Sequence, residues 1–405
     1  MARELSVRCC IAGGGPAGMM LGFLLARAGC EVAVLEKHGD FLRDFRGDTI
    51  HPSTLELMAE LGLLEEFLRR PHDKVEELAG DVGGERVVLA DFRRVPTRCK
   101  FVAFMPQWDF LDFVSRHARA LRVFHQEMRA EAHELVLEKD KVVGLRARTQ
   151  SGELLVRADL VVAADGRHST LRERAGLEIE VLGAPMDVLW MRLPREPSDP
   201  NETFGHLEPG AMFVMLNRRE YWQCAYVIPK GSYEEVRAHG LDKFRENIAG
   251  MSPFLAGRVG ELRGWDDVKL LTVAVDRLRR WWRPGLLCIG DAAHAMSPIG
   301  GVGINLAIQD AVAAANILAA PLVARAVRDE HLAAVQRRRE FPTRVTQALQ
   351  IAVQNRVISR VLAKRGGRLQ VPLFMRLLQR FPALRAIPAR LIGVGVRPEH
   401  VSAKA

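Results

Sequence analysis

The sequence predicts an α/β protein with a parallel-sheet domain, a second, mostly antiparallel β-sheet domain inserted into it, and a C-terminal helical segment. Three observations support this class. Residues 5–36 have the pattern strand, helix, strand, the middle of the chain holds several strands without helices between them, and the last part is helical and basic. A strand–helix–strand unit this short requires two parallel strands and a right-handed crossover.

The first unit begins with an apolar run over Leu5–Ala12, which is typical of a buried strand. The next elements expected in order are a helix over Met19–Ala28, a strand over Glu31–Glu36 and a helix over Pro52–Leu64. The buried-strand pattern returns at Leu154–Ala164 and Leu286–Gly290, and a long helix is expected over Ile304–Ala320.

The middle of the chain predicts an antiparallel sheet. Its expected strands are Val87–Asp91, Phe101–Phe104, Met186–Leu193, Ala211–Leu216, Tyr221–Pro229 and Val268–Ala274. A helix over Trp108–Ala120 falls between them, so the second domain is expected to be an insertion. The predicted domains are 1–72, 106–180 and 277–325 for the first, 73–105 and 181–276 for the second, and 326–405 for the C-terminal segment.

Composition excludes several protein classes. The 405 residues are 48% apolar and 26% charged, which is near the average for globular proteins and not for disordered or coiled-coil chains. The most apolar stretch, Val302–Val327, is interrupted by polar residues and Pro321, so no transmembrane span is expected. The N-terminus lacks the features of a signal peptide, and the 6 cysteines show no C-x-x-C spacing. These features favour the cytoplasm.

The positive charge is concentrated at the C-terminal end. Residues 321–405 contain 17 Lys or Arg against 4 Asp or Glu, within a chain of net charge +9. No nucleic-acid recognition motif accompanies this charge, so no nucleic-acid partner is expected. We expect short amphipathic helices that pack on the first domain and expose a solvated charged face; weak attraction to an anionic surface is the alternative.

A glycine-rich turn, Gly13-Gly14-Gly15-Pro16-Ala17-Gly18, joins the first strand to the first helix. It fits the fingerprint G-x-G-x-x-G, whose glycines allow a tight turn, a close approach to a pyrophosphate and close packing of helix and strand. The N-terminus of the helix offers N–H groups to phosphates. Glu36, at the end of the next strand, can accept hydrogen bonds from ribose hydroxyls. We therefore predict a dinucleotide site; a ligand-free turn is the alternative.

Two further motifs also follow buried strands. Asp165-Gly166-Arg167-His168-Ser169 lies at a strand end, where open α/β sheets bind ligands, although an ordinary turn is an equal alternative. The other motif is Gly290-Asp291-Ala292-Ala293-His294, followed by Pro298 and Gly300-Gly301-Val302-Gly303-Ile304-Asn305. Its acid can accept from polyol hydroxyls, and its glycines let the backbone pass a flat ring. For His294 we favour a structural hydrogen bond over a catalytic role.

In this order, the three motifs resemble those of the single-component (group A) FAD-dependent aromatic hydroxylases, which have the p-hydroxybenzoate hydroxylase-like fold. The resemblance covers roughly residues 5–320. It implies a Rossmann-like FAD-binding domain with an inserted substrate-binding sheet domain. Many relatives have Gln where this chain has Val302, which removes a side-chain role at that position only.

The resemblance also implies a set of FAD-binding residues. The ADP part would be held by Gly13, Gly15 and Gly18, with Pro16 and Ala17 in the same turn, and by Glu36. Arg46 would lie beside the pyrophosphate and flavin, Gln107 at the start of its helix, and Asp291 at the ribityl chain. Pro298, Gly303, Ile304 and Asn305 would run along the isoalloxazine, and Asp165 would serve both FAD and NAD(P)H.

The activity implied is that of an FAD-dependent monooxygenase. In the family, NAD(P)H reduces FAD, O2 forms a flavin C4a-hydroperoxide, and one oxygen is delivered to an aromatic ring. The chain has no metal-ligand cluster and no nucleophile motif, so the cofactor would carry the chemistry. It also has no second dinucleotide fingerprint, so NAD(P)H would bind without a Rossmann domain of its own.

The substrate pocket is expected between the second sheet and the flavin. Its predicted residues are Trp190, Phe213, Met215 and Tyr226, with Met212, Tyr221 and Trp222 nearby; the alternative for each is a place in the domain core. They indicate a bulky, largely apolar aromatic or polyketide-like small molecule. No residue is assigned as catalytic; the candidate acid–base groups are His206, Arg192 and Asp48.

Other functions remain open at this point. One is a flavin-dependent halogenase or another FAD redox enzyme on the same fold. The halogenase motif Trp-x-Trp-x-Ile-Pro has its nearest match at Ile228-Pro229, where Cys224 and Tyr226 occupy the tryptophan places. This difference counts against halogenation. A non-catalytic FAD-binding or membrane-docking protein is the other alternative.

Overall fold

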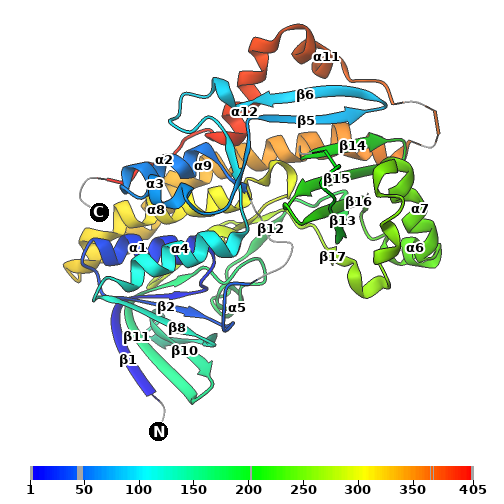
Figure 1. Cartoon of the computed structure of the whole chain (residues 1–405). Coiled ribbons are helices and arrows are strands. Elements are labelled where there is room, and N and C mark those ends of the chain that lie inside the picture. Colours follow the sequence, from blue (N-terminus) through cyan, green and yellow to red (C-terminus); the bar gives the residue numbers. More distant parts are fainter. Residues whose placement is uncertain (1–2, 43–48, 201–202, 365, 368, 403–405) are drawn as a thin grey trace.

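The computed structural model describes residues 3–42, 49–200, 203–364, 366–367 and 369–402. Arg46 and Asp48 lie outside these residues. Two large sheets dominate the fold; Figure 1 shows the first at the lower left and the second at the upper right. The predicted fold class is confirmed.

The first sheet has a parallel centre. Its order is β19-β20-β11-β1-β2-β8, and β10 and β9 extend from β11 as antiparallel neighbours. The strands are β1 (Arg3–Ala12), β2 (Val32–Glu36), β8 (Phe124–Met128), β9 (Glu131–Glu138), β10 (Lys141–Thr149), β11 (Gly152–Ala163), β19 (Trp282–Arg283) and β20 (Leu286–Cys288). Because β1, β2, β11 and β20 run parallel, their carboxyl ends lie at one edge.

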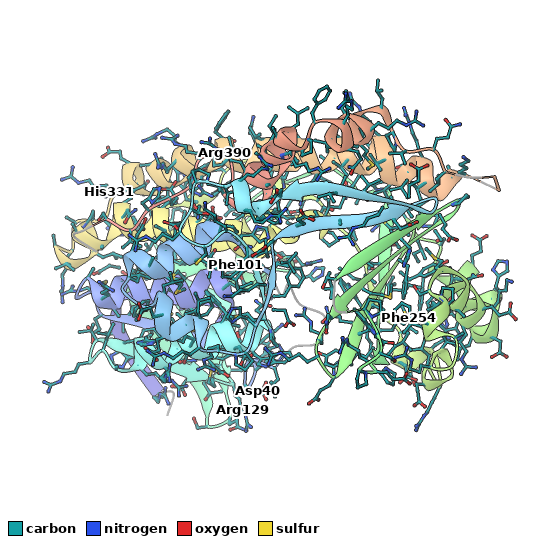
Figure 2. All side chains as sticks on the ribbon, turned by 45° about the horizontal axis from the view of Figure 1, so that its top comes forward. Asp40, Phe101, Arg129, Phe254, His331 and Arg390 are labelled. Atoms are coloured by element: carbon teal, nitrogen blue, oxygen red, sulfur yellow. The ribbon has the colours of Figure 1, made fainter. Side chains whose placement is uncertain are left out.

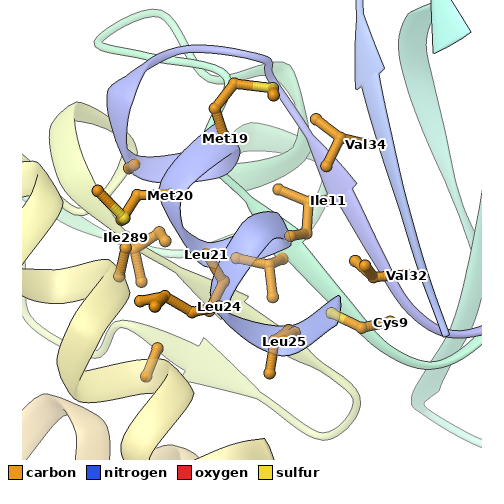
Figure 3. Packing of buried hydrophobic residues seen from close by; sticks show 14 of the residues in the cluster. Cys9, Ile11, Met19, Met20, Leu21, Leu24, Leu25, Val32, Val34 and Ile289 are labelled. Atoms are coloured by element: carbon orange, nitrogen blue, oxygen red, sulfur yellow. The ribbon is translucent and has the colours of Figure 1, made fainter. Parts of the chain in front are cut away.

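Helices α1 (Pro16–Arg27), α4 (Gln107–Arg119) and α8 (Gly303–Val323) pack together over this sheet. Figure 3 shows the core that they form, in which Ile11 and Val34 meet Leu21 and Met19 of α1. The predicted helix over 52–64 is two helices, α2 (Pro52–Glu60) and α3 (Leu64–Leu68), because Gly62 between them has a positive φ of 74°. α5 (Thr170–Arg174) follows β11.

Helix α8 is the one described helix long and apolar enough, with its preceding turn, to cross a membrane. In this fold it is a core helix, because 67% of its most apolar stretch is buried inside the protein. A helix that is apolar all round is expected at such a buried position.

The second sheet has the order β17-β13-β16-β15-β14-β5-β6, and only the β14–β5 pair is parallel. Its strands are β5 (Glu77–Val82), β6 (Glu85–Asp91), β13 (Met186–Pro194), β14 (Phe204–Glu208), β15 (Ala211–Asn217), β16 (Tyr221–Pro229) and β17 (Lys269–Leu271). Helices α6 (Tyr233–Ala238) and α7 (Leu241–Met251), which the sequence pattern did not predict, cover one face.

Two small sheets connect the large ones. One pairs β3 (Thr49–Ile50) and β4 (Asp73–Val75) with β7 (Val102–Phe104), so the strand predicted over 101–104 belongs here and not to the second large sheet. The other contains β12 (Ile179–Val181), β18 (Asp276–Leu278) and β21 (His294–Ala295).

The C-terminal segment is helical, as predicted. It comprises α9 (Asp329–Val353), a π-helical turn (Gln354–Ile358), α10 (Ser359–Ala363), α11 (Leu373–Arg380), a 3-10 turn (Pro382–Arg385) and α12 (Ala386–Gly393). α9 packs on α8, whereas α11 and α12 pack on β6 of the second sheet, so the prediction that the whole segment covers the first domain is wrong for these two helices. Residues 394–402, here called the C-terminal strap, return to α8 and α2.

Candidate functional site

The three motifs meet at the carboxyl edge of the parallel strands. A Cβ built at Gly13 would lie 2.2 Å from the carbonyl oxygen of Ala164, so the first two motifs pass backbone to backbone. One built at Gly290 would lie 3.1 Å from the Cβ of Ala17. Arg167 of the second motif lies 3.6 Å from the carboxylate of Asp291 in the third. Segments almost 300 residues apart therefore form one site.

The glycine turn fits a bound pyrophosphate. Gly13, with φ of 105°, and Gly18, whose Cβ would meet the Gly13 carbonyl oxygen at 1.9 Å, are required by the protein's own packing. Gly15 is different, because its φ is an ordinary −73° and a Cβ there would meet nothing within 4 Å. This free space lies at the N-terminus of α1, where unpaired N–H groups favour an anion. A side chain at position 15 would fill it.

Glu36 lies at the carboxyl end of β2, beside this turn. Its two carboxylate oxygens accept hydrogen bonds from the backbone N–H groups of Gly14, at 2.9 Å, and His38, at 3.0 Å. A carboxylate has about four acceptor positions, so it can accept further donors such as ribose hydroxyls. The two backbone contacts fix the orientation of this carboxylate.

The carboxylate of Asp165 makes its hydrogen bonds to groups of the protein itself. Its carboxylate accepts from the Ser169 hydroxyl at 2.5 Å and from the Leu171 N–H at 3.2 Å, which caps α5. Burial raises the pKa of Asp165, although these hydrogen bonds oppose that effect. The side chain therefore holds the second motif in shape, and a ligand there would meet the backbone and Arg167.

The loop before α8 is held from α2. Asn305, which is buried, accepts from the His51 N–H at 2.9 Å and from the Thr54 hydroxyl at 2.8 Å, and its amide donates to the Thr49 carbonyl at 2.9 Å. Pro298, Gly303 and Ile304 lie in the same loop and the first turn of α8. Because the Asn305 side chain is engaged by the protein, a flat ring along this loop would contact its backbone.

A row of buried glutamines on α9 and the π-helical turn after it holds the other side of this loop. Gln350 donates to the carbonyl oxygens of Ser297 and Ile299, both at 2.9 Å, and Gln354 donates to the Ser297 hydroxyl at 2.8 Å. Gln347 donates to the Ala295 carbonyl at 3.1 Å. These glutamines were not identified from the sequence as support for the site. Their spacing of three and four residues on an otherwise basic helix is the sequence feature that could have indicated them.

A buried network of charged residues on α8 and α9 supports the third motif. Asp310 of α8 accepts from the Gly290 N–H at 3.0 Å, lies 2.6 Å from His294 Nε2 and accepts from Arg339 Nε at 2.9 Å. Burial alone would raise the pKa of Asp310, but His294 and Arg339 outweigh it and the pKa is lowered. His294 is therefore a structural partner of Asp310. Asp310 and Arg339 were absent from the predicted site.

Gln107 opens α4 directly after β7, which pairs with β3 at Thr49. The Thr49 hydroxyl donates to the Gly301 carbonyl at 2.9 Å, so Gln107 begins its helix next to strands that border the loop before α8. Arg46 is outside the described residues, and its place in the site stays a prediction.

The predicted substrate pocket needs a correction. Phe213, Met215 and Tyr226 are buried on the face of the second sheet that α7 covers, and the ring of Tyr226 lies 5.2 Å from that of Phe244. They cannot line a pocket on the other face, because side chains alternate along a strand. Burial also raises the pKa of Tyr226, which does not favour a phenolate there.

Trp190 and Met212 are on the opposite face, together with Val214, which was not predicted. Their partly buried side chains pack in one cluster with Ile299, from the loop before α8. By register Arg192 shares the Trp190 face, whereas His206 pairs with Phe213 and lies on the other. Burial lowers the pKa of His206.

This arrangement is that of a nucleotide-dependent flavoenzyme, with a dinucleotide turn, a loop suited to a flat ring and an apolar sheet beside it. The sequence profile of the FAD binding domain family matches residues 6–349. The chain therefore belongs to this family, and it is an FAD-dependent monooxygenase of the aromatic hydroxylase type.

Individual relatives agree with this class. The chain is 32% identical over 384 residues to 6-methylpretetramide 4-monooxygenase of Streptomyces rimosus, covering 94% of this chain and 91% of that one. It is 32% identical to rifampicin monooxygenase of Streptomyces venezuelae, covering 74% of this chain and 61% of the relative. The crystal structure of pqsL, a probable FAD-dependent monooxygenase from Pseudomonas aeruginosa, has a TM-score of 0.74 at 22% identity and covers 88% of this chain and 98% of that one, which supports the fold alone.

Proposed function

We propose that this monooxygenase uses NAD(P)H and O2 to hydroxylate a bulky, largely apolar aromatic small molecule of the polyketide type. The observation that carries the proposal is the sheet face formed by Trp190, Met212 and Val214, which belongs to the same hydrophobic cluster as Ile299 of the loop before α8. A flat, apolar substrate would lie between this face and the flavin. The name of the Streptomyces rimosus relative supports a polycyclic aromatic substrate class.

The residues of the site would act by binding and positioning. The Gly13–Gly18 turn and the N-terminus of α1 would hold the pyrophosphate, and Glu36 the ribose. Asp291, held near Arg167, would accept from the ribityl hydroxyls. The N-terminus of α8 would stabilise negative charge on the ring system. Bound FAD would supply the transfer of electrons from NAD(P)H and the activation of O2.

The apolar face would exclude water from the reacting centre. In the overall reaction, one oxygen atom of O2 enters the substrate and the other leaves as water. NAD(P)H is oxidised to NAD(P)⁺ and supplies two electrons, and a proton is consumed. No described side chain is assigned as acid or base.

The domain organisation supports this arrangement. We assign 1–72, 106–180 and 277–325 to FAD binding, 73–105 and 181–276 to substrate binding, and 326–405 to the C-terminal helical segment. The two large sheets draw their strands from the first two sets. All 6 cysteines are buried and form no disulfide, and a reducing cytoplasm is the proposed location.

The test is a screen of polycyclic and simple phenols for stimulated oxidation of NADH and NADPH by the FAD-loaded protein. We expect a large aromatic compound to raise the rate and to give a product heavier by one oxygen atom. Halide-dependent formation of a halogenated product would instead support the halogenase alternative. Stimulated oxidation that yields only hydrogen peroxide, for every compound of this class, would contradict the proposed substrate.

A Met212→Trp variant tests the substrate face, because it narrows the proposed pocket. We expect the KM for large substrates to rise more than that for small ones. Phe213→Leu, one residue away on the α7 face, is the matched control and should leave this ratio unchanged while lowering stability. Equal effects of both variants on the ratio would contradict the assignment of the faces.

A further inference from the structure

The outer side of helices α11 and α12 is apolar. Their inner sides bury Met375 and Ala389 against the β5–β6 hairpin. The outward side chains and their exposed fractions are Leu373 74%, Phe374 49%, Leu377 44%, Phe381 51%, Leu384 38%, Ile387 58% and Leu391 39%. We call these residues the α11–α12 apolar face. α11 is the outermost element at the top of Figure 1.

The polarity of this face is the reverse of that expected for a helix exposed to water. A surface helix normally turns its apolar stripe inward and its polar residues outward, and an exposed apolar patch marks an interaction site. Of the large hydrophobic residues that are exposed in the described part of the chain, seven of sixteen fall in residues 373–391. Figure 2 shows side chains projecting from the upper edge of the molecule, to the right of the label of Arg390.

The segment of the chain that carries this face is positively charged. Between Glu340 and Glu399 the sequence contains 11 Lys or Arg and no Asp or Glu. Arg376, Arg380 and Arg390 are exposed among the apolar residues. A second copy of the chain would bring the same positive charges together, so charge complementarity favours an anionic occupant.

The face also offers few directional groups. The side chain of Gln379 points inward and pairs with the backbone of Val88 on β6, with its Oε1 3.3 Å from the N–H and its amide nitrogen 3.0 Å from the carbonyl. Arg385 Nε donates to the carbonyl of Leu378 at 2.9 Å. A specific protein partner is recognised through oriented hydrogen bonds at the rim of an apolar patch, whereas an anionic lipid surface requires only apolar side chains and cations.

We propose that the α11–α12 apolar face docks the enzyme on a membrane surface that contains anionic phospholipid. The leucine, isoleucine and phenylalanine side chains insert at the boundary of headgroups and acyl chains, and the arginines pair with lipid phosphates. The helices have 8 residues each, too short to cross a bilayer, so they lie in its surface. The same helices remain packed on β6 through their inner sides.

The docked face is close to the loop before α8. The carbonyl oxygen of Ile392 in α12 lies 2.7 Å from His51 Nδ1, and the His51 N–H donates to Asn305. If the proposed function holds, an apolar substrate dissolved in the bilayer would therefore be released near the site. The docking itself does not depend on the identity of the substrate.

The test is sedimentation of the FAD-loaded full chain with vesicles of phosphatidylcholine alone or mixed with phosphatidylglycerol, at about 0.1 M and about 0.5 M salt. We expect binding to the anionic vesicles, with a substantial fraction retained at high salt, where screening acts over only a few ångströms. Retention would reflect apolar insertion. Failure to bind anionic vesicles at low salt would overturn the proposal.

Two pairs of variants separate apolar from charge contributions. Phe374→Glu/Phe381→Glu should lower the bound fraction at least tenfold at both salt concentrations. Its control is Leu137→Glu/Val181→Glu, which alters side chains 48% and 78% exposed elsewhere. Arg376→Gln/Arg380→Gln should weaken binding at low salt, whereas Arg263→Gln/Arg279→Gln, whose side chains are 84% and 71% exposed, should not. Equal losses in the control variants would overturn the proposal.

A labelling experiment gives an independent readout. Because all 6 native cysteines are buried, Leu377→Cys can be labelled selectively with an environment-sensitive fluorophore. We expect its emission to shift to the blue with anionic vesicles, whereas a label at Leu137→Cys stays unchanged. A dimer in solution that Phe374→Glu abolishes would assign the face to a second copy and overturn the proposal.

Discussion

Gly15 is a glycine that the fold does not require, and we propose that the ligand requires it. Its backbone angles suit any residue, and a Cβ there meets nothing within 4 Å. Gly15→Val should therefore fold normally but fill the path of the pyrophosphate, so the purified variant should be colourless. The measurement is the ratio of flavin to protein absorbance.

Gly257→Val is the matched control for Gly15→Val, because Gly257 is exposed and also has free space around its Cβ position. It should retain FAD. A wild-type protein that cannot be reconstituted with FAD, or a yellow Gly15→Val variant, would contradict the proposed site.

Asp291 provides a graded test of the same site. Its side chain is 29% exposed and lies 3.6 Å from Arg167, so one carboxylate oxygen is available to a hydroxyl. Asp291→Ala should weaken FAD binding by about 1.5–3 kcal/mol, as expected for one hydrogen bond to a charged group. Titration of the apoprotein with FAD would show a roughly 10- to 150-fold higher Kd. Unchanged affinity would remove Asp291 from the site.

His51 makes the stability of the protein depend on pH. Burial lowers its pKa from 6.5 to about 4, although the contact with the Ile392 carbonyl opposes this shift. Between these two pH values the unfolded chain binds a proton that the folded protein does not, so stability is lost as the pH falls from 6.5 toward 4. The loss from this group is about 3 kcal/mol at the lower limit.

The variant His51→Gln isolates this contribution. It cannot be protonated, so the difference in Tm between variant and wild type should change in favour of the variant as the pH decreases from 7 to 4.5. Carboxylates elsewhere affect both proteins equally and cancel in the difference. A difference in Tm that is independent of pH would contradict the buried neutral state of His51.

At the scale of elements, the glutamine row on α9 connects a helix to the loop before α8. Gln350→Met keeps the volume but leaves the buried carbonyls of Ser297 and Ile299 without their donor. We expect a loss of about 1–3 kcal/mol in the free energy of unfolding and weaker FAD retention. Asn355→Met, at an exposed position on the same helical segment, is the control. Equal losses of stability in both variants would contradict the role of the buried glutamines in holding the loop.

The parallel elements were predictable because their signals are local. Local sequence alone specifies the apolar strands β1 and β11. It also specifies the glycine turn and the helix after it, so local preference and fold agree. The substrate face was not predictable in this way. Phe213 and Met212 are adjacent on β15, and only the position of α7 decides which of them faces the loop before α8. A one-residue change of register reverses that answer.

The polar support of the site was equally hidden. Asp310 reads as an interruption in an apolar helix, and Arg339 as one of three consecutive arginines. Their pairing depends on how α9 packs on α8, which the period of either helix does not specify. The sequence pointed to the motifs that we propose contact the ligand, whereas it gave no sign of the residues that hold those motifs in place.

At the scale of the whole molecule, one buried network joins the site to the chain end. Arg339 is 1% exposed and pairs with Asp310 at 2.9 Å and with Glu399 of the C-terminal strap at 3.2 Å. Asp310→Asn should cost about 3–5 kcal/mol, because it weakens the compensation of a buried cation. Thermal unfolding measures this cost, and Asp242→Asn, at an exposed ion pair on α7, should shift the Tm little.

The position of Glu399 has a consequence for how the protein responds to proteolysis. Arg339 and Glu399 are 60 residues apart in the sequence, and no helix or strand is described between α12 and Glu399. A single proteolytic cut between α12 and Glu399 would let the strap dissociate and leave the buried guanidinium of Arg339 with Asp310 as its remaining carboxylate partner. The nicked enzyme would keep every glycine motif intact and still be less stable than the uncut protein. Integrity of the strap is therefore a condition for a stable enzyme, although the strap contributes no motif of its own.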